Sequence, residues 1–398
     1  MSRFRAYCPE QAYLLPPSVR DELGSSHLCF FVRGVVERLD LRSFEQSYSE
    51  EGGALYAPEL MLGVWLYAYA LGITSARQVA RRLVEDLAFR YLGAGERVDN
   101  WALSAFRRRH RKALNDAFTQ VLEWAQSQGM VKLGRVAIDS TRIRASASRD
   151  RIDTEQALRD TRAQLRRQVR SWQQAADRDD EEPGGLEVAI ADLEGAIGAL
   201  SPRLEKLKKS GLAKLSRTDA DARFLRERGG VFALGYSAEI AVSDDHLIVA
   251  QRVTQNPTDN ASLPPMLEQV RQRCGALPAA ALADSGFFSI ANLEHLEEHN
   301  VEGYLPDSNL ACALNLGTRC RTRACAAVHR RMRARLRSPG GQAMYARRKA
   351  VVEPVFGVLK QQRSMRQFRT RGLDRVSSEF TLAAMAFNIT RLHTLLAA

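Results

Sequence analysis

The stretch Tyr345-Ala-Arg-Arg-Lys-Ala-Val-Val-Glu-Pro-Val-Phe-Gly-Val-Leu-Lys360 decides how this chain is interpreted, because its one acid, Glu353, stands among basic and apolar residues. The wider segment from Arg319 to Arg375 holds 17 Lys or Arg and two acids, a net charge of +15, whereas the whole chain carries +12. Lys and Arg contacts to phosphates supply most of the affinity for nucleic acid. A segment more positive than its protein therefore indicates a surface for a polyanion.

A carboxylate in such a surface is unfavourable unless a cation bridges it to the polyanion. Mg²⁺ is the usual bridge in phosphate chemistry, because it takes oxygen ligands from one or two carboxylates and from phosphates. Glu353 is therefore a candidate metal ligand at the centre of a DNA-binding surface. A glutamate that caps a helix on a solvated basic face is the alternative, and this stretch alone leaves it open.

The totals indicate a globular chain of two or three domains, with 398 residues of which 45% are apolar. No run of 18 apolar residues appears and the first residues lack a signal peptide's apolar core, so we expect a cytoplasmic protein with no membrane partner. The six cysteines are scattered, which favours free thiols. Cys312, Cys320, Cys325 and His329 are spaced more widely than the tight pairs of zinc sites, so we expect no structural zinc there.

Residues 1–130 are predicted to be helical. Apolar periodicity and turn residues predict helices over 26–39, 58–71, 75–92 and 100–128. The last of these carries the basic residues Arg107, Arg108 and Arg109, which are candidate DNA contacts. The last three of these helices, of which the third is basic, fit a helix-turn-helix DNA-binding motif. They fit equally a plain helical bundle with a solvated basic face.

Two short apolar runs after residue 130 are predicted to be buried strands that each end in an acid. Residues 135–138 lead into Asp139, and residues 279–283 lead into Asp284. Residues 232–242 and 247–254, which lie between these two strands in the sequence, are predicted to form an antiparallel strand pair. A core helix is predicted from residue 377 or 378 onward.

An insertion at 150–228 separates the first strand from the rest. Its apolar residues follow a 4-3-4-3 spacing that is typical of a coiled-coil seam, with Leu186, Ile190, Leu193, Ile197, Leu200, Leu204 and Leu207 in its second half. The spacing predicts an antiparallel helical hairpin, bent at Pro202. The seam can be buried within the hairpin or against another subunit, and the sequence leaves both open.

Two strand-end aspartates and a later glutamate predict three carboxylates that converge at one edge of a mixed sheet. Close carboxylates repel one another, so they are expected together only around cations, and two Mg²⁺ ions are the natural occupants. Two such ions clamp the attacking and leaving oxygens of a phosphoryl displacement. This is the chemistry of nucleases and of DNA strand transfer.

The residues around these acids resemble bacterial insertion-sequence transposases of the DDE class. The resemblance rests on Ile138-Asp139-Ser-Thr141, Ala283-Asp284-Ser-Gly286 and Tyr345…Arg348…Glu353…Lys360, and on the similarity of residues 55–106 to the helical N-terminal domain of one branch. It implies an α/β catalytic domain of ribonuclease H-like fold, with a mixed five-stranded sheet flanked by helices. It also implies an all-α N-terminal DNA-binding domain over 1–130 and a catalytic domain over 131–398, into which the hairpin 150–228 is inserted.

The resemblance further implies roles for single residues. Asp139, Asp284 and Glu353 would be the catalytic metal ligands, holding two Mg²⁺ ions for which Mn²⁺ can substitute. The residues expected to hold transposon-end DNA are Tyr345, Arg348, Lys349, Lys360 and Arg363, where Lys349 is included because the gap from Arg348 to Glu353 is one residue longer than in the usual signature. Pro354 disfavours helical geometry at Glu353, so the glutamate is expected at a helix N-cap or in a kinked helix.

The predicted function is that of a DNA transposase. It would bind the terminal inverted repeats of its element, cut double-stranded DNA there and transfer the strand to target DNA, working as a homodimer. Two other interpretations stay open: a catalytically silent DNA-binding protein derived from a transposase, and a ribonuclease H-type nuclease without strand transfer.

Overall fold

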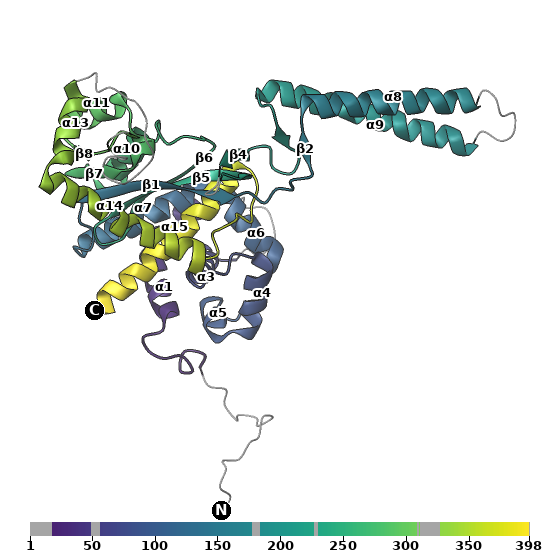
Figure 1. Ribbon diagram of the computed structural model, residues 1–398. Coiled ribbons are helices and arrows are strands. Elements are labelled where there is room, and N and C mark those ends of the chain that lie inside the picture. Colours follow the sequence, from purple (N-terminus) through teal and green to yellow (C-terminus); the bar gives the residue numbers. More distant parts are fainter. Residues whose placement is uncertain are drawn as a thin grey trace, which may run out of the picture.

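The computed structural model describes residues 18–48, 56–176, 184–226, 230–308, 310 and 327–397. A mixed sheet lies against a bundle of helices, and a long helical hairpin projects away from both (Figure 1). The helices ahead of the sheet are α1 (Leu28–Val36), α2 (Arg42–Glu45), α3 (Pro58–Ala70), α4 (Ala76–Glu85), α5 (Leu87–Leu92), α6 (Asn100–Arg109) and α7 (Arg111–Ser127).

Helix α3 is the centre of this bundle. Every residue from Met61 to Ala70 is buried, as a helix that is apolar on all sides requires. Two of the predicted helices are each divided in two. Asp86 interrupts the predicted helix 75–92, because its carboxylate accepts hydrogen bonds from the N–H groups of Ala88 and Phe89 and so begins α5. The predicted helix 100–128 is interrupted at His110, so the prediction of one continuous basic helix is wrong.

Among the described residues, six strands form the main sheet, in the order β4-β5-β1-β7-β8 with β6 also paired to β5. They are β1 (Arg135–Arg144), β4 (Arg223–Arg226), β5 (Phe232–Ser243), β6 (Ile248–Thr254), β7 (Ala280–Ala283) and β8 (Glu302–Tyr304). β5 runs antiparallel to β1, β4 and β6, whereas β1, β7 and β8 are parallel. The sheet has one strand more than predicted, because β4 pairs with the first residues of β5.

Strand β1 is longer than its apolar run predicts. Its first residues pair with both β7 and β5, and from Asp139 onward it continues beside β5, with one further bridge from Arg144 to Gln367 at its end. Asp139 therefore lies within the strand and not at its end, at the point where the partner β7 stops after Ala283. The backbone hydrogen bonds to β5 extend the strand through polar residues that carry no apolar signal.

Helices cover the sheet. They are α10 (Leu263–Cys274), α11 (Ile290–Glu298), α13 (Ala327–Arg337), α14 (Pro339–Gly357) and α15 (Leu373–Ala397), with a 3₁₀ turn η1 (Ser285–Phe287) after β7 and a π-helical turn η2 (Val358–Gln362) after α14. α15 packs against β6 and also against α3 and α7. One hydrophobic core therefore runs across the predicted boundary at residue 130. None of the described helices has the length and apolar character to cross a membrane.

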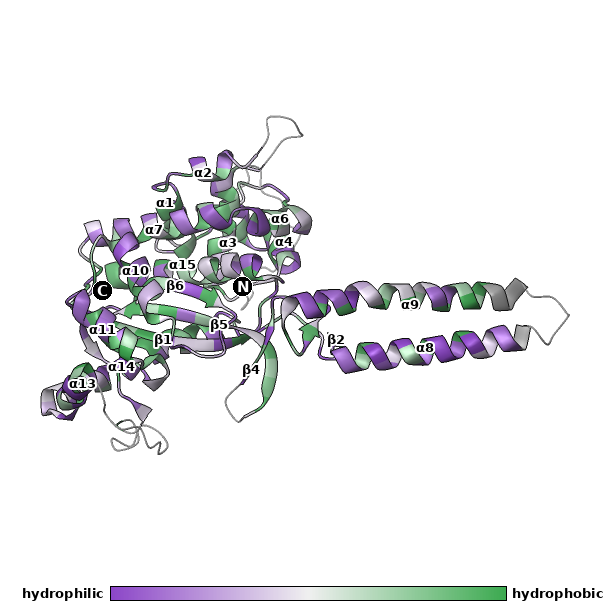
Figure 2. Cartoon of the chain, turned by 90° about the horizontal axis from the view of Figure 1, so that it is seen from above, coloured by the Kyte–Doolittle hydropathy of each residue, from purple (hydrophilic) through white to green (hydrophobic). Residues whose placement is uncertain are grey.

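The inserted hairpin consists of α8 (Glu155–Ala176) and α9 (Gly184–Ser210), which lie side by side in both views (Figures 1 and 2). Leu158, Leu200 and Leu207 are buried in a small core of its own, together with Leu215. The seam residues Ile190, Leu193 and Ile197, farther from the base, are only half-buried, so both alternatives for that part of the seam stay open. The side chain of Leu186 lies outside the described ones, and α9 continues through Pro202. A short strand pair, β2 (Ile152–Asp153) and β3 (Leu215–Ser216), closes the base, where buried Asp153 pairs with Arg203.

Gly72 in the helical bundle contacts the segment after α14, and a substitution at Gly72 tests that contact. Its φ is +74°, and a Cβ there would lie 2.4 Å from the Gln362 carbonyl oxygen. Gly72→Ala should therefore cost the left-handed backbone penalty, about 1–2 kcal/mol, plus the overlap with backbone, for a total of roughly 2–4 kcal/mol. Gly129→Ala is the matched control, because its φ is +69° and nothing lies within 4 Å. Equal losses of stability in urea for the two variants would contradict the contact.

Candidate active site

Asp139 and Asp284 are brought together by strand register. Ile138 pairs with Ala283 across the parallel strands β1 and β7, so the next residue of each chain segment is an aspartate. Asp284 caps η1 and accepts a hydrogen bond from the Gly286 N–H at 2.8 Å, while Asp139 accepts one from its neighbour Ser140 N–H at 2.7 Å. Backbone donors thus orient both carboxylates.

Burial dominates the electrostatics of Asp139. The pKa of this carboxyl is raised from 3.8 to about 6, chiefly by burial, and the charge of Asp284 contributes to the increase. The guanidinium of Arg348 acts in the opposite direction, since its Nη1 donates to Asp139 Oδ2 at 2.9 Å. The pair of aspartates is thus an unfavourable concentration of negative charge that one arginine offsets in part.

Arg348 and Tyr345 reach this site from the buried face of α14. Both are buried, and the Arg348 guanidinium lies over the Tyr345 ring at 5.9 Å. Arg348 Nε is buried without a hydrogen-bond partner. A buried donor without an acceptor costs free energy, so the arginine is held ready for a further acceptor.

Glu353 lies on the other side of α14, exposed to solvent. Ser338 is the N-cap of this helix, so the expectation of Glu353 at an N-cap is wrong and the glutamate lies within a helix that also contains Pro354. Within the described part of the chain, the oxygens of Asp139, Asp284 and Glu353 are not all within 4.8 Å of one another. The strand register brings the two aspartates together, and Glu353 lies on α14, a helix that packs against β1 and β7.

The predicted basic residues divide into exposed and interior ones. Lys349, Arg108 and Arg109 are exposed. Lys360 Nζ donates to the Arg142 carbonyl at 3.0 Å, and Arg363 to Thr390 Oγ1 at 3.1 Å.

Arg107 is buried in the bundle, where its guanidinium lies over the Trp65 ring at 4.6 Å and donates to the Tyr69 hydroxyl at 2.8 Å. Its interior partners explain why it faces no solvent in this structure.

Asp259 is a fourth acid that the sequence did not single out. It lies in the loop between β6 and α10, and its Oδ2 would be 3.4 Å from a Cβ at Gly286, where Asp284 Oδ1 would be 3.0 Å away. Asp259 Oδ1 is buried without a hydrogen-bond partner, 3.6 Å from Arg142 Nη1. Burial raises its pKa, Arg142 and Ser140 lower it, and Asp284 raises it further. No period or strand end marks this loop residue, so only the fold reveals it.

These acids fit a divalent metal. Mg²⁺ prefers carboxylate oxygens, and here two aspartates on adjacent strands and a third nearby acid share one edge of the sheet. The raised pKa of Asp139 and the unpaired oxygen of Asp259 are both unfavourable features that a cation would relieve. Among the described residues, Asp139, Asp284 and Asp259 are candidate donors for such an ion, although their oxygens, like those of the set with Glu353, are not all within 4.8 Å of one another.

Comparison with protein families gives two matches. Residues 210–389 match the family described as Transposase DDE domain, and residues 18–109 match that described as Transposase domain (DUF772). Comparison with curated proteins and with solved structures gave no match. The first region contains Asp284 and Glu353 and begins after Asp139 and most of the hairpin.

Both matched regions are transposase domains, one in the helical bundle and one across the sheet. The chain belongs to the insertion-sequence transposases of the DDE class, proteins of mobile elements whose substrate is DNA.

The raised pKa of Asp139 predicts how Asp139→Asn alters stability with pH. The folded protein holds this proton up to about pH 6, whereas the unfolded chain releases it near 3.8, so the ionised carboxylate costs stability above pH 6. In a chelating buffer the variant should exceed the native protein in stability by about 1–3 kcal/mol at pH 7.5. The gain should shrink towards zero as the pH falls through 6 to 4. Chemical denaturation across this range is the measurement, and a gain independent of pH would contradict the shift.

Proposed function

We propose that this chain is an active transposase that binds the terminal inverted repeats of its element, cleaves the DNA there and transfers the strand to a target. The observation that carries the proposal is the pair Asp139 and Asp284, adjacent on parallel strands and faced by Arg348. A structural role for two mutually repelling, largely buried aspartates is unfavourable, whereas a metal-dependent reaction requires them.

We also propose that the sheet is a ribonuclease H-like catalytic domain over 131–398, with 1–130 as a DNA-binding domain and 150–228 as an insertion. The supporting observation is the strand arrangement, in which β6, β5 and β1 are successive antiparallel neighbours and β7 and β8 continue parallel to β1. The acids lie where the parallel strand β7 ends, which is the edge that binds ligands in α/β sheets.

Asp139, Asp284 and Glu353 are the proposed metal ligands, and Asp259 is an additional acid beside them. Mg²⁺, or Mn²⁺ in its place, supplies activation of the attacking oxygen and neutralisation of charge on the phosphate when it is bound. The chain's own groups hold the carboxylates in place, through the N–H groups of Ser140 and Gly286. In this proposal the Arg348 guanidinium leaves Asp139 and binds a DNA phosphate instead. Glu353 then joins the two aspartates as a metal ligand.

The proposed DNA contacts are the exposed Lys349, Arg108 and Arg109, together with Tyr345 and Arg348 beside the acids and with Lys360 and Arg363. Transposition requires two element ends in one complex, so a homodimer on DNA is proposed. Because Ile190, Leu193 and Ile197 of the hairpin are only half-buried, a subunit contact on the hairpin would use this part of the seam.

The proposal is tested by cleavage of labelled DNA that carries the element's own ends, with Mg²⁺ present. Glu353→Gln should abolish end cleavage, by at least about 10³-fold, and leave binding to the ends intact, because the carboxylate is needed for the metal and not for the fold. Glu294→Gln is the matched control, an exposed glutamate on α11, and it should cleave normally.

Each outcome separates the alternatives. Binding without cleavage by the native protein would favour the silent DNA-binding derivative. Cleavage of DNA regardless of its ends, without joining to a target, would favour the ribonuclease H-type nuclease.

The basic run on α6 predicts opposite effects for neighbouring arginines. Replacing exposed Arg108 and Arg109 by Gln should weaken DNA binding and reduce the slope of log K against log salt by about 0.9 for each phosphate that the variant no longer neutralises. Replacing buried Arg107 by Gln should leave that slope unchanged for the folded protein and cost roughly 3–5 kcal/mol of stability, because Glu379 would lose its nearest cation. Fluorescence anisotropy over a salt series and urea denaturation distinguish the two. An unchanged slope in the Arg108 and Arg109 variant would contradict their role.

A further inference from the structure

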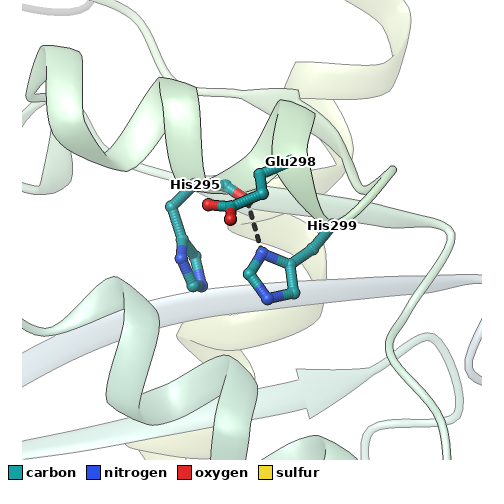
Figure 3. A group of neighbouring side chains, drawn as sticks. All are labelled: His295, Glu298 and His299. Carbon is teal, nitrogen blue, oxygen red and sulfur yellow. Dashed lines mark hydrogen bonds between the residues drawn. The ribbon is translucent and has the colours of Figure 1, made fainter.

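The last turn of α11 and the residue after it present three metal-binding side chains at one place. His295, Glu298 and His299 each offer a ligand atom, and these atoms all lie within 4.8 Å of one another. Figure 3 shows the two imidazole rings side by side below the helix, with the Glu298 carboxylate next to them. Residues at i, i+3 and i+4 share one helix face, so the backbone alone keeps the three together.

The hydrogen bonding of the rings favours metal binding. His299 Nδ1 lies 2.9 Å from the His295 carbonyl oxygen, which can only accept, so Nδ1 carries the proton. This tautomer leaves the lone pair of His299 Nε2 free for a metal, as in zinc sites where the second ring nitrogen donates to a carbonyl. The ring centroids are 4.2 Å apart, so both imidazoles can reach one ion.

The surroundings favour a cation as well. The aligned peptide dipoles of α11 give its C-terminal end a partial negative charge. Glu268 on α10 lies near enough to act electrostatically on both histidines.

We propose that His295, Glu298 and His299 form a zinc-binding site separate from the catalytic edge. Two imidazole nitrogens and one carboxylate oxygen are a donor set that Zn²⁺ accepts with a fourth position left to water, whereas Mg²⁺ prefers oxygen ligands. The site goes beyond the proposed transposase chemistry, since none of the proposed catalytic acids contributes to it.

The place of this site in the fold gives the ion a consequence for the sheet. α11 follows directly on η1, which Asp284 caps, and the chain returns after His299 into β8, which pairs with β7. Asn292 on the same helix donates to the carbonyls of Asn260 and Phe287, on either side of the acidic edge. Zinc on the last turn would therefore stiffen the helix that supports Asp284.

Calorimetric titration of the full chain with ZnCl₂ is the test, because it reports binding without reference to DNA cleavage. The native protein is expected to bind one equivalent of zinc, and the double variant His295→Ala/His299→Ala is expected to bind none at this site. In Glu298→Gln the affinity for zinc should fall by at least about tenfold. Glu294→Gln, the same change of charge on the same helix outside the cluster, should bind as the native protein does. Asp139→Asn should retain the equivalent, which separates this site from the catalytic acids.

Two outcomes would overturn the proposal. The native protein could bind no zinc, or the double histidine variant could keep the full stoichiometry and affinity, which would assign the ion to other groups such as the thiols of Cys312, Cys320 and Cys325, residues outside the described ranges. Circular dichroism of each variant shows that it is folded, so a missing equivalent reports the ligands and not the fold.

Discussion

The packing of α15 between the edge of the sheet and the helical bundle is the constraint on which the rest of the structure depends. Asn388, fully buried on this helix, accepts from the Ile248 N–H and donates to the Ile248 carbonyl, both at 2.8 Å. It thereby satisfies backbone groups at the edge strand β6, which would otherwise stay unpaired. Because α15 also packs against α3 and α7, the bundle cannot move without disturbing the sheet.

A buried carboxylate on α15 reinforces this junction. Glu379 accepts hydrogen bonds from the Arg369 and Thr370 N–H groups and lies 4.0 Å from Arg107 of the bundle. A buried charge is tolerated only with such partners, so the polar network fixes one arrangement of the two parts, where apolar packing alone would allow several. Arg107 thus connects bundle and sheet, and the matched transposase regions at either end of the chain meet in one core.

What the sequence could predict depends on how local the signal is. Some elements have an apolar pattern that a short window of sequence contains, and these were predictable. They are the apolar run of α3, the heptad seam of the hairpin and the apolar runs before Asp139 and Asp284. The interior place of Arg107, the nearness of Asp259 to Asp284 and the length of β1 depend on partners that lie far away along the chain, which no short window of sequence contains. Local capping by Asp86 was readable in principle, but the continuous apolar period across it hid the break. The roles of the acids and the ribonuclease H-like fold stay predictions.

Under the proposed function, the charges around Asp139 and Asp284 mean that metal and DNA assist each other's binding. Asp139 is paired with Arg348 and repelled by Asp284, so a cation that binds the two aspartates competes with the guanidinium for the same carboxylate. A DNA phosphate is the natural acceptor for an arginine so displaced, because it takes a guanidinium as readily as a carboxylate does. The metal then compensates the aspartate charge that the displaced arginine leaves, and the DNA phosphate compensates the arginine that the metal displaces. By thermodynamic linkage, metal raises the affinity for DNA by the same factor by which DNA raises the affinity for metal. In the proposed function, Arg348 offsets part of the negative charge at this edge until DNA and metal bind.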